Sequence, residues 1–299
     1  MSIRPVKRLI QSKPATEGAG VHLRRAFGFG NTGEFDPFLL LDDFRNDVPE
    51  DYLAGFPWHP HRGIETITYV LAGSVEHGDS LGNRGAITPG DVQWMTAGSG
   101  IIHQEMPKGD PAGRMHGFQL WANLPGSLKM TPPRYQEVKA NDIPALTDDD
   151  GTHVRLVCGS FWGKRGPVDG IAADPVYIDV SVPPGRRKTL PVETTRHAFA
   201  YVFAGSGKFC NASEPLEVPT EPVGWLNTTP PASAENRSLI LFDRGDEVAV
   251  EAGDDGIRFL LVSGKPLQEP VAWYGPIVMN TQDELRQAFR DLEKGTFLK

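Results

Sequence analysis

A six-residue segment occurs twice in this chain, and the repeat restricts the fold more than any other feature. Residues 69–74 read Tyr-Val-Leu-Ala-Gly-Ser, and residues 201–206 read Tyr-Val-Phe-Ala-Gly-Ser, 132 positions later. A second pair follows in the same order, because Asp91–Met95 resembles Pro222–Leu226 at an offset of 131 positions. Self-similarity at a nearly fixed offset is typical of a duplicated structural unit. The 299-residue chain is therefore predicted to contain two related domains.

The composition indicates that both domains consist of β-strands. The chain holds 33 glycines and 26 prolines, which favour short strands and tight turns over long helices. Apolar or alternating runs predict strands at 21–27, 36–44, 64–71, 85–87, 92–95, 117–124, 153–159 and 176–182. The acidic stretch 141–151 is loop-like, so we predict domains at 1–140 and 141–299. We expect an all-β protein.

One segment near the C-terminus carries a helical pattern instead. Apolar residues recur there at helical spacing, at positions 285, 288, 289 and 292. Thr281 and Glu284 have the spacing of a capping box, with acidic residues at the positive end of the helix. We expect this helix to pack against one of the domains rather than to bind a partner.

The first domain contains two pairs of potential metal ligands. His59 and His61 flank a proline, and His103 and Glu105 flank a glutamine. Side chains alternate along a strand, so the two members of each pair share a face. One such pair is weak evidence, since histidines on strands are common, but two pairs of equal parity can meet in a sheet rich in hairpins. Three imidazoles and a carboxylate suit Fe, Mn, Ni, Co, Cu or Zn better than Mg.

The second domain lacks an equivalent set. The offset of the repeat places Pro191, Glu193, Glu235 and Arg237 at the four corresponding positions. His197 stands alone in a predicted strand, where a histidine is more often a core or surface residue than a ligand. We therefore expect one divalent transition metal per chain, bound in the first domain.

Charge and cysteine content limit the partners and the compartment. A formal charge of −8 argues against direct binding of nucleic acid. Cys158 and Cys210 are too few for a disulfide scaffold, which suits a reducing compartment. Residues 1–13 lack the apolar core of a secretory signal, and no run has the length of a membrane span. We expect a monomeric cytoplasmic protein, and a nuclear location stays open.

Several stretches of the sequence resemble the pirin family of the two-domain cupin superfamily. The matching segments are spread over nearly the whole chain and are 35–44, 59–66, 89–98, 100–103 and 275–281. The resemblance implies two cupin-type (jelly-roll) β-barrels that face each other, a metal in the N-terminal barrel, an empty C-terminal barrel and a short C-terminal helix. The ligands that it implies are His59, His61, His103 and Glu105, with Fe(2+) as the expected metal.

An alternative for the fourth ligand stays open at this point. In the general cupin pattern the glutamate follows the His-x-His pair by a few residues, and Glu65 stands there with the parity of the two histidines. Parity alone does not separate it from Glu105. The pirin resemblance favours Glu105, and the general cupin motif with a histidine soon after Pro-x-Gly is absent, because Gln93 and Trp94 stand there.

The resemblance also implies two functions of different classes. Pirins are similar to quercetin 2,3-dioxygenases, which open the central ring of a flavonol with dioxygen and release carbon monoxide. Glu105 would then accept the proton of the flavonol hydroxyl group. Trp58, Trp94 and Phe118 are expected to line an apolar pocket for flat aromatic molecules. Other pirins resemble transcriptional coregulators, which are non-catalytic, bind protein partners and respond to the redox state of the metal.

Overall fold

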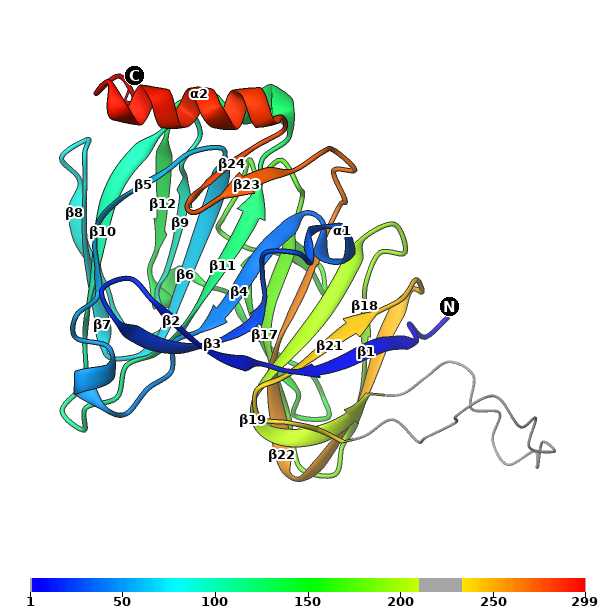
Figure 1. Ribbon diagram of the computed structural model, residues 1–299. Coiled ribbons are helices and arrows are strands. Elements are labelled where there is room, and N and C mark those ends of the chain that lie inside the picture. The colour runs from blue at the N-terminus through cyan, green and yellow to red at the C-terminus, as the bar shows by residue number, and fades with distance from the viewer. Residues whose placement is uncertain (1, 210–232, 299) are drawn as a thin grey trace.

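The computed structural model describes residues 2–209 and 233–298 and contains two β-domains that pack side by side (Figure 1). Both the all-β class and the C-terminal helix are confirmed. Cys210 and the second copy of the tryptophan motif, at 222–226, lie outside the described residues. Within the described part of the chain, no helix has the length and apolarity needed to cross a membrane.

The N-terminal domain is a jelly-roll-like sandwich of two antiparallel sheets. The seven-stranded sheet has the order β12 (Arg134–Val138), β9 (Val92–Thr96), β6 (Ile64–Ala72), β11 (His116–Asn123), β4 (Phe38–Asp43), β3 (Val21–Phe27) and β2 (Lys13–Glu17). The four-stranded sheet has the order β5 (Phe56–His61), β10 (Ile101–Lys108), β7 (Ser74–Asp79) and β8 (Arg84–Ile87). Both predicted ligand pairs lie in the second sheet, on the neighbouring strands β5 and β10.

The C-terminal domain is built from one strongly bent sheet of nine strands. Its main path runs β1 (Val6–Gln11), β21 (Ser238–Phe242), β19 (His197–Phe209), β22 (Glu247–Gly264), β17 (Val176–Val182), β14 (His153–Cys158) and β13 (Ala145–Thr147). Two further strands branch from it, β18 (Arg187–Pro191) beside β22 and β20 (Ala234–Glu235) beside β19. Two small hairpins complete the strands, β15 (Ser160–Phe161) with β16 (Lys164–Arg165) and β23 (Ala272–Tyr274) with β24 (Ile277–Met279).

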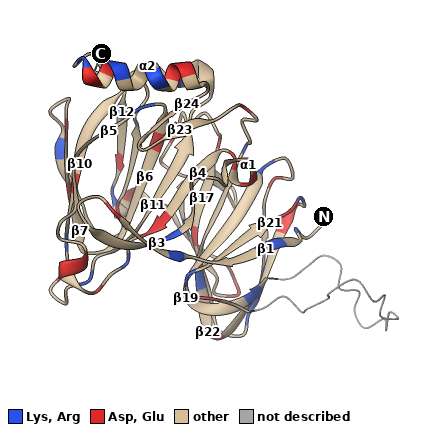
Figure 2. Cartoon of the chain, viewed as in Figure 1, with Lys and Arg blue, Asp and Glu red and all other residues tan. Residues whose placement is uncertain are grey.

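The predicted helix is α2 (Gln282–Glu293), and it begins as the sequence indicates. Thr281 accepts a hydrogen bond from the backbone of Glu284, whose carboxylate accepts one from the backbone of Thr281. Acidic and basic residues are interspersed along it (Figure 2), and its inner side buries Leu285 and Ala288. A second helix, α1 (Thr32–Phe35), is a single turn, and short 3₁₀ turns occupy Pro49–Asp51, Gly126–Leu128 and Ala140–Asp142.

The two ends of the chain each cross to the other domain. At the start of the chain, β1 pairs with β21 in the C-terminal sheet. At the other end, β23, β24 and α2 lie over the N-terminal domain (Figure 1). The buried Arg62 fixes this packing, because its guanidinium group binds Asp291 of α2 at 2.8 Å and the carbonyl oxygen of Phe297 at 2.8 Å. The residue directly after His61 therefore anchors the C-terminal segment.

The sequence repeat is visible in the contact between the domains. Tyr69 on β6 and Tyr201 on β19, the first residues of the two repeated segments, are both buried there. Tyr69 donates a hydrogen bond of 2.8 Å to Asp179 of the C-terminal domain, and Tyr201 donates one of 2.8 Å to Asp43 of the N-terminal domain. In the N-terminal sheet, Phe118 on the intervening strand stands opposite both Tyr69 and Asp43. In the C-terminal sheet, Leu260 stands in the same way between Tyr201 and Asp179. The duplicated units thus face each other through a reciprocal pair of hydrogen bonds.

These two hydrogen bonds are expected to contribute measurably to stability. Burial, together with the neighbouring aspartate, raises the pKa of each tyrosine, so both phenols stay protonated donors. Tyr69→Phe or Tyr201→Phe should each lower the free energy of unfolding by about 1–3 kcal/mol, because a buried carboxylate loses a partner. Chemical denaturation measures the change. Tyr274→Phe, at an exposed tyrosine, is the control and should change it by less than about 0.5 kcal/mol.

Candidate metal centre

Three imidazoles converge inside the N-terminal domain. In the antiparallel pairing of β5 with β10, His103 of β10 stands opposite His59 of β5. His61 lies two residues after His59 on β5. Their ligand nitrogens all lie within 4.8 Å of one another, and the Nε2 atoms of His59 and His61 are 3.1 Å apart. The structure therefore brings together the three histidines whose spacing and parity the sequence singled out.

The chemical state of this cluster fits a bound transition metal. His103 is buried, and neither of its ring nitrogens has a hydrogen-bond partner among the described residues. Burial lowers the pKa of His61 and of His103 well below the ordinary value, and the neighbouring histidines add to this effect. Metals bind the neutral imidazole, so the buried, unpartnered ring nitrogens of His103 are suited to a metal ion.

Backbone carbonyl groups orient two of the rings. Nδ1 of His59 lies 2.9 Å from the carbonyl oxygen of Pro57, and Nδ1 of His61 lies 3.2 Å from that of Pro276. A ring nitrogen that donates to a carbonyl leaves Nε2 as the metal ligand. Pro276 belongs to the loop between β23 and β24, so the C-terminal segment helps to hold a histidine of the N-terminal domain.

Glu105 lies beside the three histidines but outside their tightest cluster. Its Oε2 atom is 4.0 Å from Nε2 of His103, and its Oε1 atom is 3.1 Å from Oγ1 of Thr68. Burial raises the pKa of Glu105, against the opposing effects of His59 and the hydrogen bond from Thr68. The role of Glu105 as a fourth ligand stays a prediction, with Oε2 as the oxygen nearest the histidines.

Glu65 lies elsewhere, because the chain turns between β5 and β6. The turn is made by Gly63 at φ +78, where a Cβ atom would lie 1.9 Å from the carbonyl oxygen of Val278. Because of this turn, the alternation of side chains along β5 does not continue into β6. The spacing from His59 and His61 therefore does not predict the face on which Glu65 lies. The carboxylate accepts a hydrogen bond of 2.7 Å from Thr96. It projects from the face of β6 opposite to Thr68, which favours Glu105 as the carboxylate near the histidines.

A cavity of about 760 Å³ opens beside the histidines. Its aromatic walls are formed by Phe29, Phe44, Tyr52, Phe56, Trp121, Trp273 and Tyr274. Our expectation that Trp58, Trp94 and Phe118 line this pocket is wrong. Trp94 and Phe118 project from the other face of the sheet into the core between the domains, and Trp58 points to solvent, 53% exposed.

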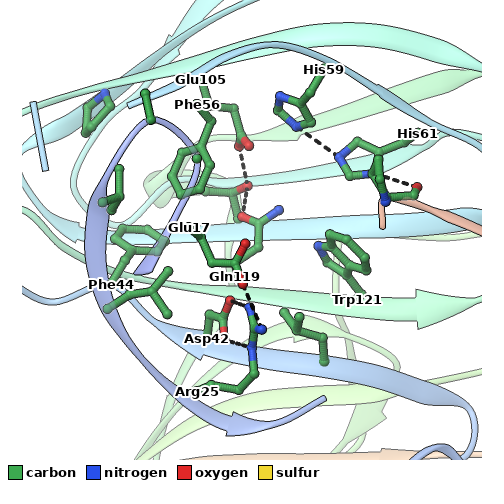
Figure 3. A pocket seen from close by; sticks show the side chains of 18 of the residues that line it. Glu17, Arg25, Asp42, Phe44, Phe56, His59, His61, Glu105, Gln119 and Trp121 are labelled. Atoms are coloured by element: carbon green, nitrogen blue, oxygen red, sulfur yellow. Dashed lines mark hydrogen bonds and ion pairs between the residues drawn. The ribbon is translucent and has the colours of Figure 1, made fainter. Parts of the chain in front are cut away.

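The wall of the cavity farthest from Glu105 in Figure 3 carries an ion pair. Arg25 binds both carboxylate oxygens of Asp42, at 2.9 and 2.7 Å, and also contacts Glu17 at 2.8 Å. Burial raises the pKa of Asp42 to about 6, against the opposing effect of Arg25. Asp43, on the other face of the strand, binds Arg45. Both adjacent aspartates therefore have structural partners, as expected for residues that are not metal ligands.

Sequence reasoning missed the contribution of residues 273–276 to the cavity. Trp273, Tyr274 and Pro276 line it although they follow the nine-stranded sheet of the C-terminal domain in the chain. Only the family resemblance at 275–281 pointed to this segment, and it assigned no role to it.

The described part of the second domain contains no comparable cluster. At the corresponding positions, Pro191 ends β18, and Glu193 forms an ion pair of 2.9 Å with Arg196. Among residues 2–209 and 233–298, the histidines of the first domain are the one group whose ligand atoms converge. A single metal site per chain stays a prediction.

Comparisons with known proteins identify the family. The pirin family model matches residues 20–122, and the model of the pirin C-terminal cupin domain matches residues 177–298. The chain is 44% identical, over 99% of its length, to a pirin-like protein of Caulobacter vibrioides, of which it covers 100%. It is 41% identical, over 98% of its length, to a Pseudomonas aeruginosa protein provisionally named a quercetin 2,3-dioxygenase, of which it covers 97%.

A solved structure agrees with this relationship. The crystal structure of a quercetin 2,3-dioxygenase from Acinetobacter baumannii superposes with a TM-score of 0.85 and 31% sequence identity, and the match covers 99% of each chain. Since these relatives match over the whole length and in both domains, the chain belongs to the pirin family of two-domain cupins.

Proposed function

We propose that this protein is a metal-dependent dioxygenase of the quercetin 2,3-dioxygenase type, which opens a flavonol ring with dioxygen and releases carbon monoxide. One observation carries the proposal: the three imidazoles of His59, His61 and His103 converge beside an aromatic cavity of about 760 Å³. Small-molecule sites in proteins are mostly apolar clefts of about 300–1,000 Å³ with a few polar groups, so the cavity has the size for a flat polyphenol. The relatives named as quercetin 2,3-dioxygenases support the same reaction.

The residues have separate roles in this proposal. His59, His61 and His103 hold the metal with Glu105, and when bound the metal, which we propose is Fe(2+), supplies Lewis acidity to a flavonol oxygen. Oε2 of Glu105 accepts the proton of the flavonol hydroxyl group. Trp121 and the aromatic side chains of residues 273–274 enclose the flat rings and keep water away from the deprotonated substrate.

Metal-dependent turnover of a flavonol tests the proposal. The full-length protein is stripped with a chelator, reloaded anaerobically with Fe(2+), and mixed with quercetin in air. We expect loss of the visible absorbance band of quercetin together with release of carbon monoxide, and neither change with the stripped protein. Separate reloading with Mn, Ni, Co, Cu and Zn compares the metals that the ligand set accepts.

The opposite result would favour the second class of function. If no metal supports turnover across a panel of flavonols, the dioxygenase proposal is overturned. A non-catalytic pirin that binds a protein partner would then be the better account of this site.

A further inference from the structure

A row of polar side chains crosses the cavity face of the seven-stranded sheet next to the histidines. In the strand register, Gln119 of β11 stands opposite Asp42 of β4 on one side and Thr68 of β6 on the other, and Thr68 stands opposite Gln93 of β9. Directly opposed residues in a sheet point to the same face, so this row faces Glu105 on the second sheet. Such a row is unusual in a cavity whose other walls are largely apolar.

Thr68 connects this row to Glu105. Its hydroxyl oxygen lies 3.1 Å from Oε1 of Glu105 and 2.7 Å from Oε1 of Gln119. A hydroxyl group has one proton and cannot donate to both neighbours at once. When Glu105 is ionised, Thr68 can donate to it if the Gln119 amide turns its nitrogen to Thr68, since amide oxygen and nitrogen are interchangeable in such a site. The hydrogen bonds then run from Gln119 through Thr68 to Glu105.

This contact involves one carboxylate oxygen and leaves the other directed to the histidines. Oε1 of Glu105 is held by Thr68, while Oε2 is 4.0 Å from Nε2 of His103. The terminal torsion of a glutamate side chain has broad minima, so a hydrogen bond to one oxygen fixes the direction of the other. We propose that Thr68, itself held by Gln119, is a positioning residue that keeps Oε2 of Glu105 directed toward the metal position. The inference rests on the metal site of the proposed function, but not on flavonol turnover.

Paired substitutions at Thr68 test this role. Thr68→Val keeps the branched shape and removes the hydroxyl group, whereas Thr68→Ser keeps the hydroxyl group. Loss of a partner that orients a ligand typically weakens metal binding 10–100-fold, so Thr68→Val should raise the dissociation constant for Co(2+) by at least about tenfold. Thr68→Ser should recover most of the loss. Calorimetric titration of stripped full-length protein with Co(2+) measures both constants.

Thr96 provides a matched control. It is a buried threonine in the same sheet, and its hydroxyl group donates to the buried Glu65 at 2.7 Å. Thr96→Val therefore removes an equivalent hydrogen bond away from the histidines. We expect it to lower the melting temperature as Thr68→Val does, but to leave the Co(2+) constant and the visible spectrum of the bound Co(2+) unchanged.

Two outcomes would overturn the positioning role. The first is a Co(2+) constant and visible spectrum for Thr68→Val that match wild type. The second is an equal weakening of Co(2+) binding by Thr68→Val and Thr96→Val, which would indicate a general loss of stability. Because neither measurement involves quercetin, failure of the dioxygenase proposal leaves this test intact.

Discussion

Replacing Glu105 by glutamine is expected to lower flavonol turnover per bound metal by at least about a hundredfold, because a positioned general base contributes roughly 10²–10⁴-fold to rate. Glutamine keeps the size of the side chain and one oxygen donor, so metal binding should weaken but persist. An amide is not a base near neutral pH, so the proton-accepting role is lost. The measurement is the steady-state rate divided by the metal content of the same sample.

Glu65→Gln is the matched control for this prediction. Glu65 is also buried and also accepts a threonine hydroxyl proton, yet it lies on the other face of β6. Its replacement should leave the rate per metal near the wild-type value. If Glu65→Gln abolishes activity while Glu105→Gln does not, then Glu105 is the wrong carboxylate.

Replacing any one of the three histidines by alanine is expected to remove most of the bound metal. The wild-type chain should bind one equivalent of metal, in the N-terminal domain. Each variant should retain far less metal after dialysis, because a site with only four protein ligands depends on every one of them. Elemental analysis measures the metal content. The fold should persist, since each domain has its own apolar core, and circular dichroism checks this.

A histidine of the second domain tests the location of the site. His197→Ala, at the start of β19, should leave one equivalent bound. Two equivalents in the dialysed wild-type protein, or full metal content in the His103→Ala variant, would contradict a single site built by these three histidines.

Local sequence patterns predicted much of the fold. Residues 21–27 form β3 as predicted, the segment 64–71 is β6 within one residue, and Thr281 caps the helix as its spacing indicates. These features depend on neighbours in the sequence, on alternation along a strand and on a side chain that reaches its own helix end. The repeated segments correctly indicated two related units, and their first tyrosines occupy equivalent places in the contact between them.

Features of the site that depend on tertiary packing were not accessible from the sequence. Alternation shows that Phe118 and Gln119 project from opposite faces of β11, but not which face borders the cavity and which borders the other domain. We therefore predicted that Phe118 lines the pocket, whereas the structure places Gln119 there and Phe118 in the core between the domains. The contact of His61 with Pro276 spans 215 positions of the chain. No local pattern indicates a contact over that separation.

The exchange of chain ends between the domains also limits how this protein can be divided. The loop that holds the His61 ring lies 215 positions further along the chain, and the helix residue that binds Arg62 lies 229 positions further along. The metal site is therefore not a contiguous module that recombination could transfer to another protein in one piece. A protein that kept only the N-terminal half of this chain would retain the histidine ligands. It would lose the Pro276 carbonyl group that orients His61 and the cavity wall formed by residues 273–276. The two similar domains cannot be separated without removing a strand from one of them and a cavity wall from the other.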